Sequence, residues 1–312
     1  MKCGNFGLQE MIYEMPSSLV EVDKLVKDAG LDDEMVSKLH NGGLQRVPVN
    51  DGNPLPNLVR ASITNLVQMI PNLSKKTSGI LFAHSVPLLA PANVPFLSLG
   101  LKGHNFENIP RVAISGQPCA ILHMAALLAG NWLNDFPKGR GILLIGADQA
   151  YSVQERIFFG SAMGDVAVAM FVSRETTRNK VLASVSECKV IATGGEASLP
   201  EDIAQFRSLN PLYIRHAIEM CLLDGGIDLE SLSYIVPHTP YTTMWDTIAE
   251  LLRFPRQNIL TDYMSETGHL NSNDSFVHYI RAVREGRICN GDMALLVNPG
   301  FGGTRGCTLI RR

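Results

Sequence analysis

The stretch ISGQPCAIL, residues 114–122, decides the fold because it joins a strand to a helix through a sharp bend. RVAIS, residues 111–115, is rich in β-branched residues and predicts the strand. Pro118 suits a first helical position, since its missing N–H would have had no partner there, and the apolar run after it predicts a buried helix. Cys119 is therefore expected in the first helical turn, where unpaired amides and the helix dipole favour a thiolate. The alternative is a small buried core residue, as free cysteine often is.

The composition is that of a globular chain able to bury a large core. The 312 residues are 46% hydrophobic and 18% charged. Six scattered cysteines without a CxxC pair predict free thiols and a cytoplasmic protein. A formal charge of −3 without a dense basic run argues against a nucleic-acid partner. We expect neither a secretion signal nor a membrane span, because no basic-then-apolar leader and no long apolar run is present.

Strand and helix patterns alternate along the chain and predict α/β layers with a mostly parallel sheet. The first eighty residues read as helical or loop-like up to a strand at 78–84. A similar order returns after about residue 175, which predicts two halves, 1–175 and 176–312. The expected elements of the second half include strands at 233–238 and 258–263 and helices at 244–254 and 273–286.

His238 closes the predicted strand YIVPH, as Cys119 follows the strand of the first half. In open α/β sheets, sites gather at the carboxyl ends of strands. An imidazole there could take a proton from the thiol or donate to an oxyanion. The alternative is a structural histidine.

ETGHLNSNDSF, residues 266–276, gathers polar side chains between a strand and a helix. One interpretation is a helix cap formed by Asn273 or Asp274. The other is that one residue of this segment orients His238, as the third member of a catalytic triad does. Both interpretations can hold together.

NPGFGGTRG, residues 298–306, has four glycines between two predicted strands. A hairpin explains two of them, and the others indicate backbone amides close to a ligand, aimed at a developing oxyanion. The stretch is no phosphate loop, because it enters no helix and lacks the Gly-Lys-Ser/Thr ending. No metal is expected either, since the histidines show no H-x₃-H spacing and the cysteines form no pair.

Taken in order, these motifs resemble the thiolase superfamily, and within it the β-ketoacyl-ACP synthase III group. The resemblance covers almost the whole chain and rests on SGQPCAILHMAALLAG, GILLIGAD, FFGSAMGDVAVAMFVSRE, YIVPH and NPGFGGTRGCTLIR. It implies a five-layered αβαβα fold of two fused halves with pseudo-twofold symmetry. The first half, 1–175, would carry the nucleophilic cysteine, and the second, 176–312, the histidine and Asp or Asn; a homodimer is usual.

The resemblance also implies roles for the site residues. Cys119 would take an acyl group from an acyl-carrier-protein (phosphopantetheine) or coenzyme A thioester, and His238 would handle the proton. Backbone amides would stabilise the oxyanion, those of Cys119, Gly300, Phe301, Gly302 and Gly303. No cofactor would stay bound, and the acceptor would be a small molecule.

One departure from the family concerns the reaction. Condensing members carry an asparagine after the glycine, whereas Gly268 is followed here by His269. The G-H-x-x-x-x-D pattern resembles members proposed to use a Cys-His-Asp triad, some of which move acyl groups onto oxygen or nitrogen. Asp274 would then make His238 a better base for the acceptor. The alternatives are a decarboxylating synthase in which Asn271 or His269 replaces the usual asparagine, and a non-catalytic partner subunit, against which the retained Cys119 and His238 argue.

Another departure concerns the donor. Coenzyme-A-using members tend to carry a tryptophan near the position of Met35, and a basic residue where this chain has the run Thr239 to Thr243. Without an aromatic platform for adenine, a carrier-protein donor is favoured, and with it specialised biosynthesis related to polyketides or fatty acids. The segments 85–96 and 195–212 are expected to wall the acyl tunnel.

Overall fold

A mixed β-sheet organises the chain, and the computed structural model describes residues 6–50, 52, 54–86, 96–158, 160–188 and 199–312. Within these residues, nine strands form one sheet in the order β11-β12-β13-β10-β1-β9-β6-β4-β5. Among these nine, the pairs β4–β5, β4–β6 and β11–β12 are parallel and the others antiparallel, so the expectation of a mostly parallel sheet is wrong. The strands are β1 (Phe6–Glu14), β4 (Thr77–Ala83), β5 (Arg111–Ile114), β6 (Gly141–Asp148), β9 (Val166–Ser173), β10 (Lys180–Cys188), β11 (Tyr234–Pro237), β12 (Met293–Pro299) and β13 (Thr304–Arg311).

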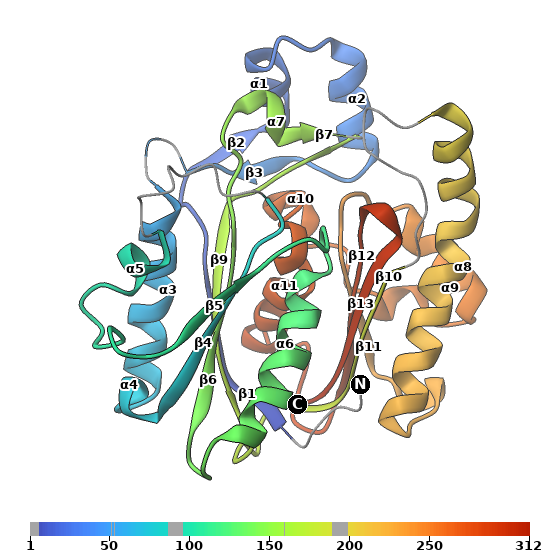
Figure 1. Ribbon diagram of the computed structural model, residues 1–312. Helices are drawn as coiled ribbons and strands as arrows, with labels where there is room; N and C mark the ends of the chain where they lie inside the picture. Colours follow the sequence, from blue (N-terminus) through green and yellow to red (C-terminus); the bar gives the residue numbers. More distant parts are fainter. Residues whose placement is uncertain (1–5, 51, 53, 87–95, 159, 189–198) are drawn as a thin grey trace.

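The helices lie in layers on and between the two parts of this sheet (Figure 1). The longer ones are α3 (Leu55–Met69), α6 (Ile121–Trp132), α8 (Pro200–Gly225), α9 (Met244–Leu252) and α11 (Asp274–Arg284). Helix α3 packs on β1 and β9, α6 and α11 fill the middle, and α8 packs on β10 and β13. This gives the order helix, sheet, helices, sheet, helix, and the five-layered αβαβα class is confirmed.

Short elements complete the chain, and those around α1, α2 and α7 cap one end of the layers (Figure 1). They include β2 (Leu19–Glu21), α1 (Val22–Asp28), α2 (Asp33–Asn41), β3 (Arg46–Pro48), α4 (Leu73–Lys76), α5 (Phe96–Leu101), α7 (Val153–Arg156), β7 (Ile157–Phe158), β8 (Ser161–Ala162) and α10 (Met264–Thr267). The 3₁₀ turns are η1 (Leu133–Asp135), η3 (Leu229–Ser231), η4 (Arg256–Asn258), η5 (Asn271–Asn273) and η6 (Phe301–Gly303). The strands β2 and β3 pair with each other, as do β7 and β8.

The two ends of the large sheet repeat each other. From the centre outward, β1-β9-β6-β4-β5 corresponds to β10-β13-β12-β11 followed by a parallel bridge at Ile259. In each series the first two pairings are antiparallel and the next two parallel. A short antiparallel contact between β1 and β10 joins the series. This repeat supports the proposed division at residues 175 and 176, which stays a prediction.

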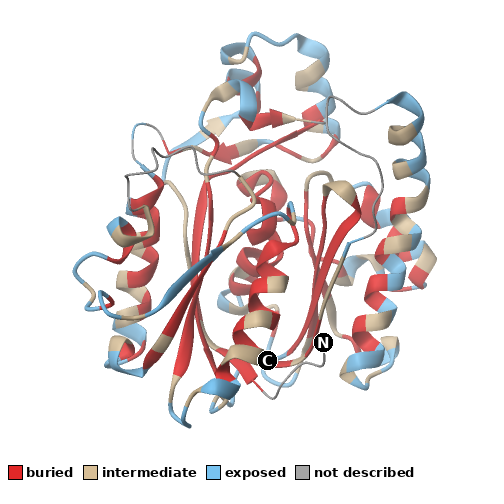
Figure 2. Ribbon diagram, viewed as in Figure 1, coloured by how far each residue is buried: buried red, intermediate tan, exposed pale blue. Residues whose placement is uncertain are grey.

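Burial follows the layers (Figure 2). The main apolar cluster lies where α6 and α11 meet the inner faces of the sheet, and further clusters lie under α3, under α8 and in the cap around α1 and α2. All five cysteines within the described residues are free thiols, as expected, while Cys3 lies outside those residues. Among the described residues, no helix is both long and apolar enough to cross a membrane.

Two elements differ from the sequence expectation. The first eighty residues were expected to be helical or loop-like up to residue 78, yet β1 is a central strand that pairs with both β9 and β10. Its half-buried residues Gln9 and Glu10 and a register shift between Leu8 and Glu10 obscure its alternation. The expected strand at 258–263 forms only a single parallel bridge, at Ile259, directly after the 3₁₀ turn η4 (Arg256–Asn258).

Candidate active site

Cys119 lies in the bend between β5 and α6, close to but not inside the helix. The helix begins at Ile121, so the expected first turn starts three residues later than Pro118. Cys119 has a φ of 61°, in the left-handed region that residues other than glycine rarely adopt. Its N–H donates to Ser85 Oγ at 3.2 Å, and its carbonyl accepts from Asn298 Nδ2 at 2.9 Å. These two contacts hold the strained bend in place.

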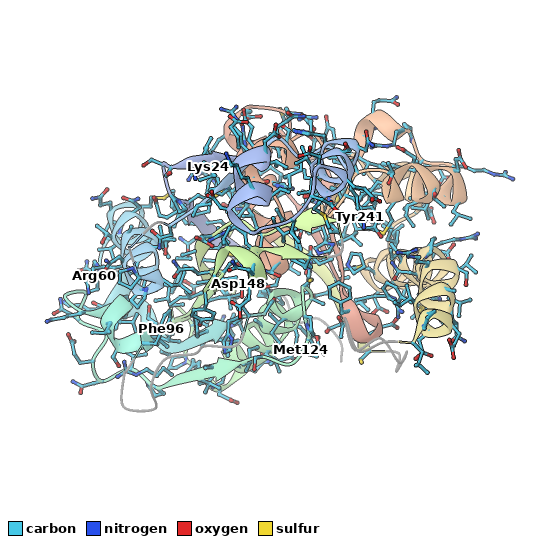
Figure 3. The ribbon with its side chains drawn as sticks, turned by 90° about the horizontal axis from the view of Figure 1, so that it is seen from above. Lys24, Arg60, Phe96, Met124, Asp148 and Tyr241 are labelled. Atoms are coloured by element: carbon cyan, nitrogen blue, oxygen red, sulfur yellow. The ribbon has the colours of Figure 1, made fainter. Side chains whose placement is uncertain are left out.

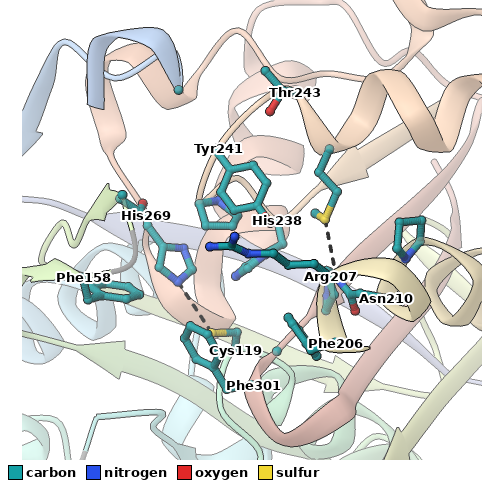
Figure 4. Close-up of a pocket in the computed structure, with 18 of the residues that line it drawn as sticks. Cys119, Phe158, Phe206, Arg207, Asn210, His238, Tyr241, Thr243, His269 and Phe301 are labelled. Carbon is teal, nitrogen blue, oxygen red and sulfur yellow. Dashed lines mark hydrogen bonds between the residues drawn. The ribbon is translucent and has the colours of Figure 1, made fainter. Parts of the chain in front are cut away.

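His269 faces Cys119 (Figure 4) with one ring nitrogen and Asp274 with the other. Its Nε2 is 3.6 Å from Cys119 Sγ, and its Nδ1 is 2.6 Å from Asp274 Oδ2. All three side chains are buried. The His269 N–H donates to the carbonyl of Ala162 and fixes the backbone against β8. The geometry is therefore that of a Cys-His-Asp triad whose histidine is His269.

Asp274 is fixed independently of the imidazole. Its Oδ1 accepts the Leu270 N–H at 2.6 Å, and its Oδ2 also accepts the Thr239 N–H at 3.1 Å. The carboxylate thus joins the start of α11 to the segment after β11. An ionised carboxylate only accepts, so His269 carries its proton on Nδ1 and presents the lone pair of Nε2 to the sulfur.

His238 was expected to hold the middle position of the triad, and the structure corrects this. Its Nε2 is 3.9 Å from Asp274 Oδ2, too far for a hydrogen bond, and its ring stands perpendicular to that of His269 with centroids 4.4 Å apart. Within the described part of the chain, neither buried ring nitrogen of His238 has a hydrogen-bond partner. The backbone is firmly held, because the His238 carbonyl accepts from Trp245 Nε1 at 2.8 Å.

The electrostatics of the site differ from the thiolate expected at a helix start. Burial raises the pKa of the Cys119 thiol well above its usual value, and the carboxylates of Asp274 and Asp148 raise that pKa further. Burial also lowers the pKa of His238 well below its usual value. Burial would raise the pKa of Asp274, but His269 and His238 beside it lower it to about 2. A protonated thiol therefore faces an imidazole backed by a carboxylate.

Asn271, a candidate substitute for the family's asparagine, has its side chain turned elsewhere. Its Nδ2 contacts Met163 Sδ at 2.6 Å, and its carbonyl accepts from Asn298 Nδ2. Its φ is 55°, so the backbone here is also left-handed. His269, which follows Gly268 directly, occupies the position next to the sulfur instead.

The glycine turn is explained in part by packing. The Gly300 N–H donates to the Thr304 carbonyl at 2.8 Å, so the expected oxyanion donor at this position is occupied. A Cβ at Gly300 would collide with the carbonyl of Pro118, which explains a glycine there. Gly302 and Gly303 have φ of 67° and 74°, a conformation that glycine adopts without strain.

Two cavities meet at Cys119. The larger, of about 720 Å³, is lined by Cys119, His238 and His269 together with residues of α2, α8 and α9. The smaller, of about 380 Å³, is lined by Ser85, Asn271 and Met163, among others. Cys119, Phe158 and Phe301 line both, so two aromatic rings flank the sulfur where the cavities join.

The expected tunnel walls fall on these cavities in part. Ser85 and Val86 line the smaller cavity, and α8 contributes to the larger one, with Phe206 and Arg207 visible in Figure 4. Residues 87–95 and 195–198 of the two expected segments lie outside the described residues.

Sequence reasoning missed the contact between Asp148 and the loop after β4. Asp148 Oδ1 accepts the N–H groups of Ser85 and Val86, and its Oδ2 accepts from Asn273 Nδ2. Figure 3 shows Asp148 near the middle of the molecule, whereas Arg60 lies near its edge. The sequence did offer one signal for this contact. Asp148 is the single charged residue of the otherwise apolar strand GILLIGAD and stands at its carboxyl end.

Comparisons with known proteins show which proteins this chain resembles. Residues 222–312 match the family described as 3-oxoacyl-[acyl-carrier-protein (ACP)] synthase III C terminal. The β-ketoacyl-[acyl-carrier-protein] synthase III of Rickettsia canadensis (strain McKiel) is 22% identical over 95% of this chain and 96% of that protein. The chain is a β-ketoacyl-ACP synthase III-like protein. The same enzyme of Aquifex aeolicus (strain VF5) is 25% identical over 56% of this synthase III-like chain, a match that spans 58% of the relative's length.

A solved structure extends the comparison to the fold. The acyltransferase ChlB3 superposes with a TM-score of 0.84 at 20% identity, over 98% of this chain and 97% of its own. At this identity, the superposition establishes a shared fold. The resemblance to β-ketoacyl-ACP synthase III seen in the sequence is thus confirmed.

Proposed function

We propose that this synthase III-like protein is an acyltransferase that loads an acyl group onto Cys119 and passes it to an oxygen or nitrogen nucleophile. The observation that carries the proposal is the position of His269, 3.6 Å from the sulfur and 2.6 Å from Asp274. A base backed by a buried carboxylate is what removal of a proton from an alcohol, an amine or a thiol requires. The residue stands where condensing members of the family carry an uncharged asparagine.

Acylation begins with the protonated thiol. As Cys119 Sγ attacks the carbonyl carbon of the donor thioester, its proton moves to His269 Nε2, and Asp274 stabilises the imidazolium. The tetrahedral intermediate then collapses, the bond from carbon to the donor sulfur breaks, and His269 returns the proton to the leaving thiolate. The products are S-acyl Cys119 and the free donor thiol.

Transfer repeats these steps with the acceptor. His269 Nε2 takes the proton of an acceptor O–H or N–H as that atom attacks the acyl carbon. The carbon–sulfur bond to Cys119 breaks, and the thiolate regains the proton from His269. The acceptor leaves as an ester or amide, and the enzyme returns to its starting state.

His238 serves in a second role. It is neutral, since burial depresses its pKa, and its unpartnered ring nitrogens border the larger cavity beside Cys119. A neutral imidazole with its N–H aimed at the reacting carbonyl stabilises the negative charge that develops on oxygen. We assign this donor role to His238 in place of the base role expected from the sequence.

The proposed donor is a phosphopantetheine thioester on a carrier protein, with coenzyme A as the alternative. Lys38 and Arg207 line the larger cavity from two different helices, α2 and α8, and a phosphate on the pantetheine arm suits such a pair. Met35 packs half-buried in the cap of α1 and α2 and offers no aromatic platform for adenine. The proposal keeps specialised polyketide- or fatty-acid-related biosynthesis, a cytoplasmic location, a homodimer and the absence of a bound cofactor.

Intact mass spectrometry tests the proposal. Wild-type protein and Cys119→Ala are incubated with a panel of acyl-carrier and acyl-CoA thioesters, and then with alcohols and amines. We expect an adduct of the acyl mass in wild type, none in the variant, and loss of the adduct when the acceptor is added. Adduct formation in Cys119→Ala would refute the covalent step.

The same panel separates the other candidate reactions. If carbon dioxide is released from a malonyl thioester and a new carbon–carbon bond forms, the function is decarboxylative condensation and not acyl transfer to oxygen or nitrogen. If no donor forms an adduct, the chain acts as a non-catalytic partner subunit and the proposed acyl transfer is refuted.

A further inference from the structure

Three side chains of the site have the composition and spacing of a metal-binding set. Cys119 Sγ, a ring nitrogen of His238 and Nε2 of His269 all lie within 4.8 Å of one another, and all three residues are buried. They come from three separate segments, after β5, after β11 and after α10, that meet at the larger cavity (Figure 4). Their wide separation in sequence explains why no ligand spacing was visible there.

We propose that Cys119, His238 and His269 together bind a thiophilic divalent cation, Zn²⁺, and leave its fourth coordination position open to the larger cavity. Three protein ligands with one open position is the arrangement of exchangeable zinc sites, and mixed sulfur and imidazole donors suit this ion. The binding itself does not depend on the proposed acyl transfer.

The distances between the three ligand atoms fit Zn²⁺ if His238 moves slightly toward the other two. Zn–S of about 2.3 Å and Zn–N of about 2.0–2.1 Å at a tetrahedral angle put sulfur and nitrogen about 3.5 Å apart. The separation of Cys119 Sγ and His269 Nε2 is 3.6 Å. The ring nitrogen of His238 lies within 4.8 Å of the other two ligand atoms. It has to move toward them by about an ångström to reach a tetrahedral arrangement around the ion. Its ring is free to do so, since neither of its nitrogens is held by a hydrogen bond among the described residues.

The surroundings supply what a metal-ligating histidine needs. His269 Nδ1 bonds Asp274 Oδ2 at 2.6 Å, which fixes the tautomer that aims the Nε2 lone pair at the ion. The buried Asp274 carboxylate and a Cys119 thiolate together carry two negative charges, which balance the charge of Zn²⁺. The unpartnered buried nitrogens of His238 are an independent sign of an absent ligand, because buried polar atoms are normally bonded.

Binding has a chemical consequence for the enzyme. The Cys119 S–H bond breaks as the Zn–S bond forms, and the proton is released to solvent, with no change of oxidation state. Cys119 Sγ and His269 Nε2 then both coordinate the ion, so neither electron pair is available to attack an electrophile or to accept a proton. Zinc therefore protects the thiol from electrophiles, and, resting on the proposed function, it blocks acyl loading reversibly.

The test uses the full chain in which the other reactive thiols are removed. Cys188 and Cys289 are exposed, and Cys3 lies outside the described residues, so Cys3→Ser/Cys188→Ser/Cys289→Ser is the parent protein. Zn²⁺ binding is measured by equilibrium dialysis, and Co²⁺ is used as an absorbing substitute. We expect about one ion per chain and a cobalt–thiolate absorption band.

Variants of the parent decide which residues bind. We expect Cys119→Ala to abolish the cobalt–thiolate band, and His238→Ala and Asp274→Asn each to weaken zinc binding at least ~10-fold. His216→Ala, on the outer helix α8, is the matched control and should bind as the parent does. Circular dichroism of each variant checks that the fold is retained. Unchanged zinc binding in folded Cys119→Ala and His238→Ala would overturn the proposal.

A second readout needs no acyl transfer and no variant at the site. Zn²⁺ should protect Cys119 of the parent from alkylation by iodoacetamide, with Cys119 read by peptide mass, and EDTA should restore the labelling. Labelling at the same rate with and without zinc would overturn the proposal. A protein that binds zinc at these residues yet forms no acyl adduct would leave the metal site standing and refute the proposed function alone.

Discussion

At the scale of single residues, the site depends on which of two neighbouring histidines meets the sulfur. His238 and His269 both lie near Asp274, at 3.9 Å and 2.6 Å from its Oδ2. The shorter contact selects His269 as the base, because N–H···O hydrogen bonds extend to about 3.2 Å and the His238 contact is longer than that. His238 is left with free nitrogens facing the cavity.

This assignment predicts unequal effects of two alanine variants. His269→Ala should slow single-turnover acylation of Cys119 by ~10²–10⁴-fold, because the buried thiol loses its general base. His238→Ala should slow it less, since a donor is lost but the base remains. The measurement is the rate of adduct formation by quenched-flow mass spectrometry. A larger loss in His238→Ala than in His269→Ala would return the base role to His238.

Asp148 predicts a pH dependence of stability. Burial raises its pKa to about 7, against the N–H groups of Val86 and Ser85 that lower it. A raised carboxyl pKa means that the folded state holds the proton more tightly, so this contribution is fully present below about pH 4 and is lost as the pH rises through 7. The free energy of unfolding of the wild type should therefore decrease between pH 5 and pH 8. The decrease should be smaller in Asp148→Asn, which has no carboxyl group to titrate at this position.

Urea unfolding of both proteins at pH 5 and pH 8 measures that difference. The asparagine can still accept the N–H groups of Ser85 and Val86, and the unpartnered Oδ1 of Asn273 can turn to accept its amide. Other titrating groups are common to both proteins and cancel in the comparison. Identical pH slopes for the two would contradict the assignment to Asp148.

At the scale of elements, a buried ion pair holds the short segments that border the smaller cavity. Arg156 of α7 contacts both carboxylate oxygens of Asp165 at 2.8 and 3.0 Å and donates to the Met163 carbonyl. Asp165 in turn accepts the N–H groups of Asn50 and Ala150. The pair thus ties α7, β8 and the loop after β6 to the start of β9.

We predict that Arg156→Ala lowers the free energy of unfolding by about 3–5 kcal/mol, because Asp165 keeps a buried charge without its partner. Arg215→Ala, which removes an exposed pair with Glu219 on α8, should change it by about 0.5 kcal/mol or less. Chemical denaturation followed by tryptophan fluorescence compares them. Equal effects of the two substitutions would show that burial does not set the strength of the Arg156 pair.

Elements with a clear apolar pattern were predictable, and those whose pairing depends on distant strands were not. GILLIGAD and DVAVAMFVSRE became β6 and β9, both buried along their length. The strand β1 was missed because its neighbours, β9 and β10, lie more than 150 residues away and its own residues are only half apolar. Pairing partners, more than local propensity, decide such a strand.

At the scale of the whole molecule, β5 ends the large sheet with an open edge. Its residues Arg111, Val112 and Ala113 are exposed, and Val112 is 47% accessible. An exposed strand edge pairs readily with another strand. Together with the family resemblance, this supports the proposed homodimer, with β5 of two copies side by side.

Val112→Asp tests the dimer. Two copies would place like charges opposite each other at the edge, so we expect the variant to be monomeric by light scattering at concentrations where wild type is dimeric. Leu223→Asp is the matched control, since Leu223 is 71% exposed on α8 at the far side of the layers, and it should leave the mass unchanged. A monomeric wild type, or a dimeric Val112→Asp, would contradict the prediction.

The sequence by itself determined the resemblance to β-ketoacyl-ACP synthase III, the layered α/β class and the segments that carry the chemistry, because these depend on local pattern and on motifs that follow one another in order. Cys119, His238, His269 and Asp274 were all named from it. Only the tertiary structure decided that His269 stands between Cys119 and Asp274, and that burial raises the pKa of the Cys119 thiol. Those outcomes depend on distances between segments brought together from the two halves of the chain and on burial from water, neither of which local sequence encodes.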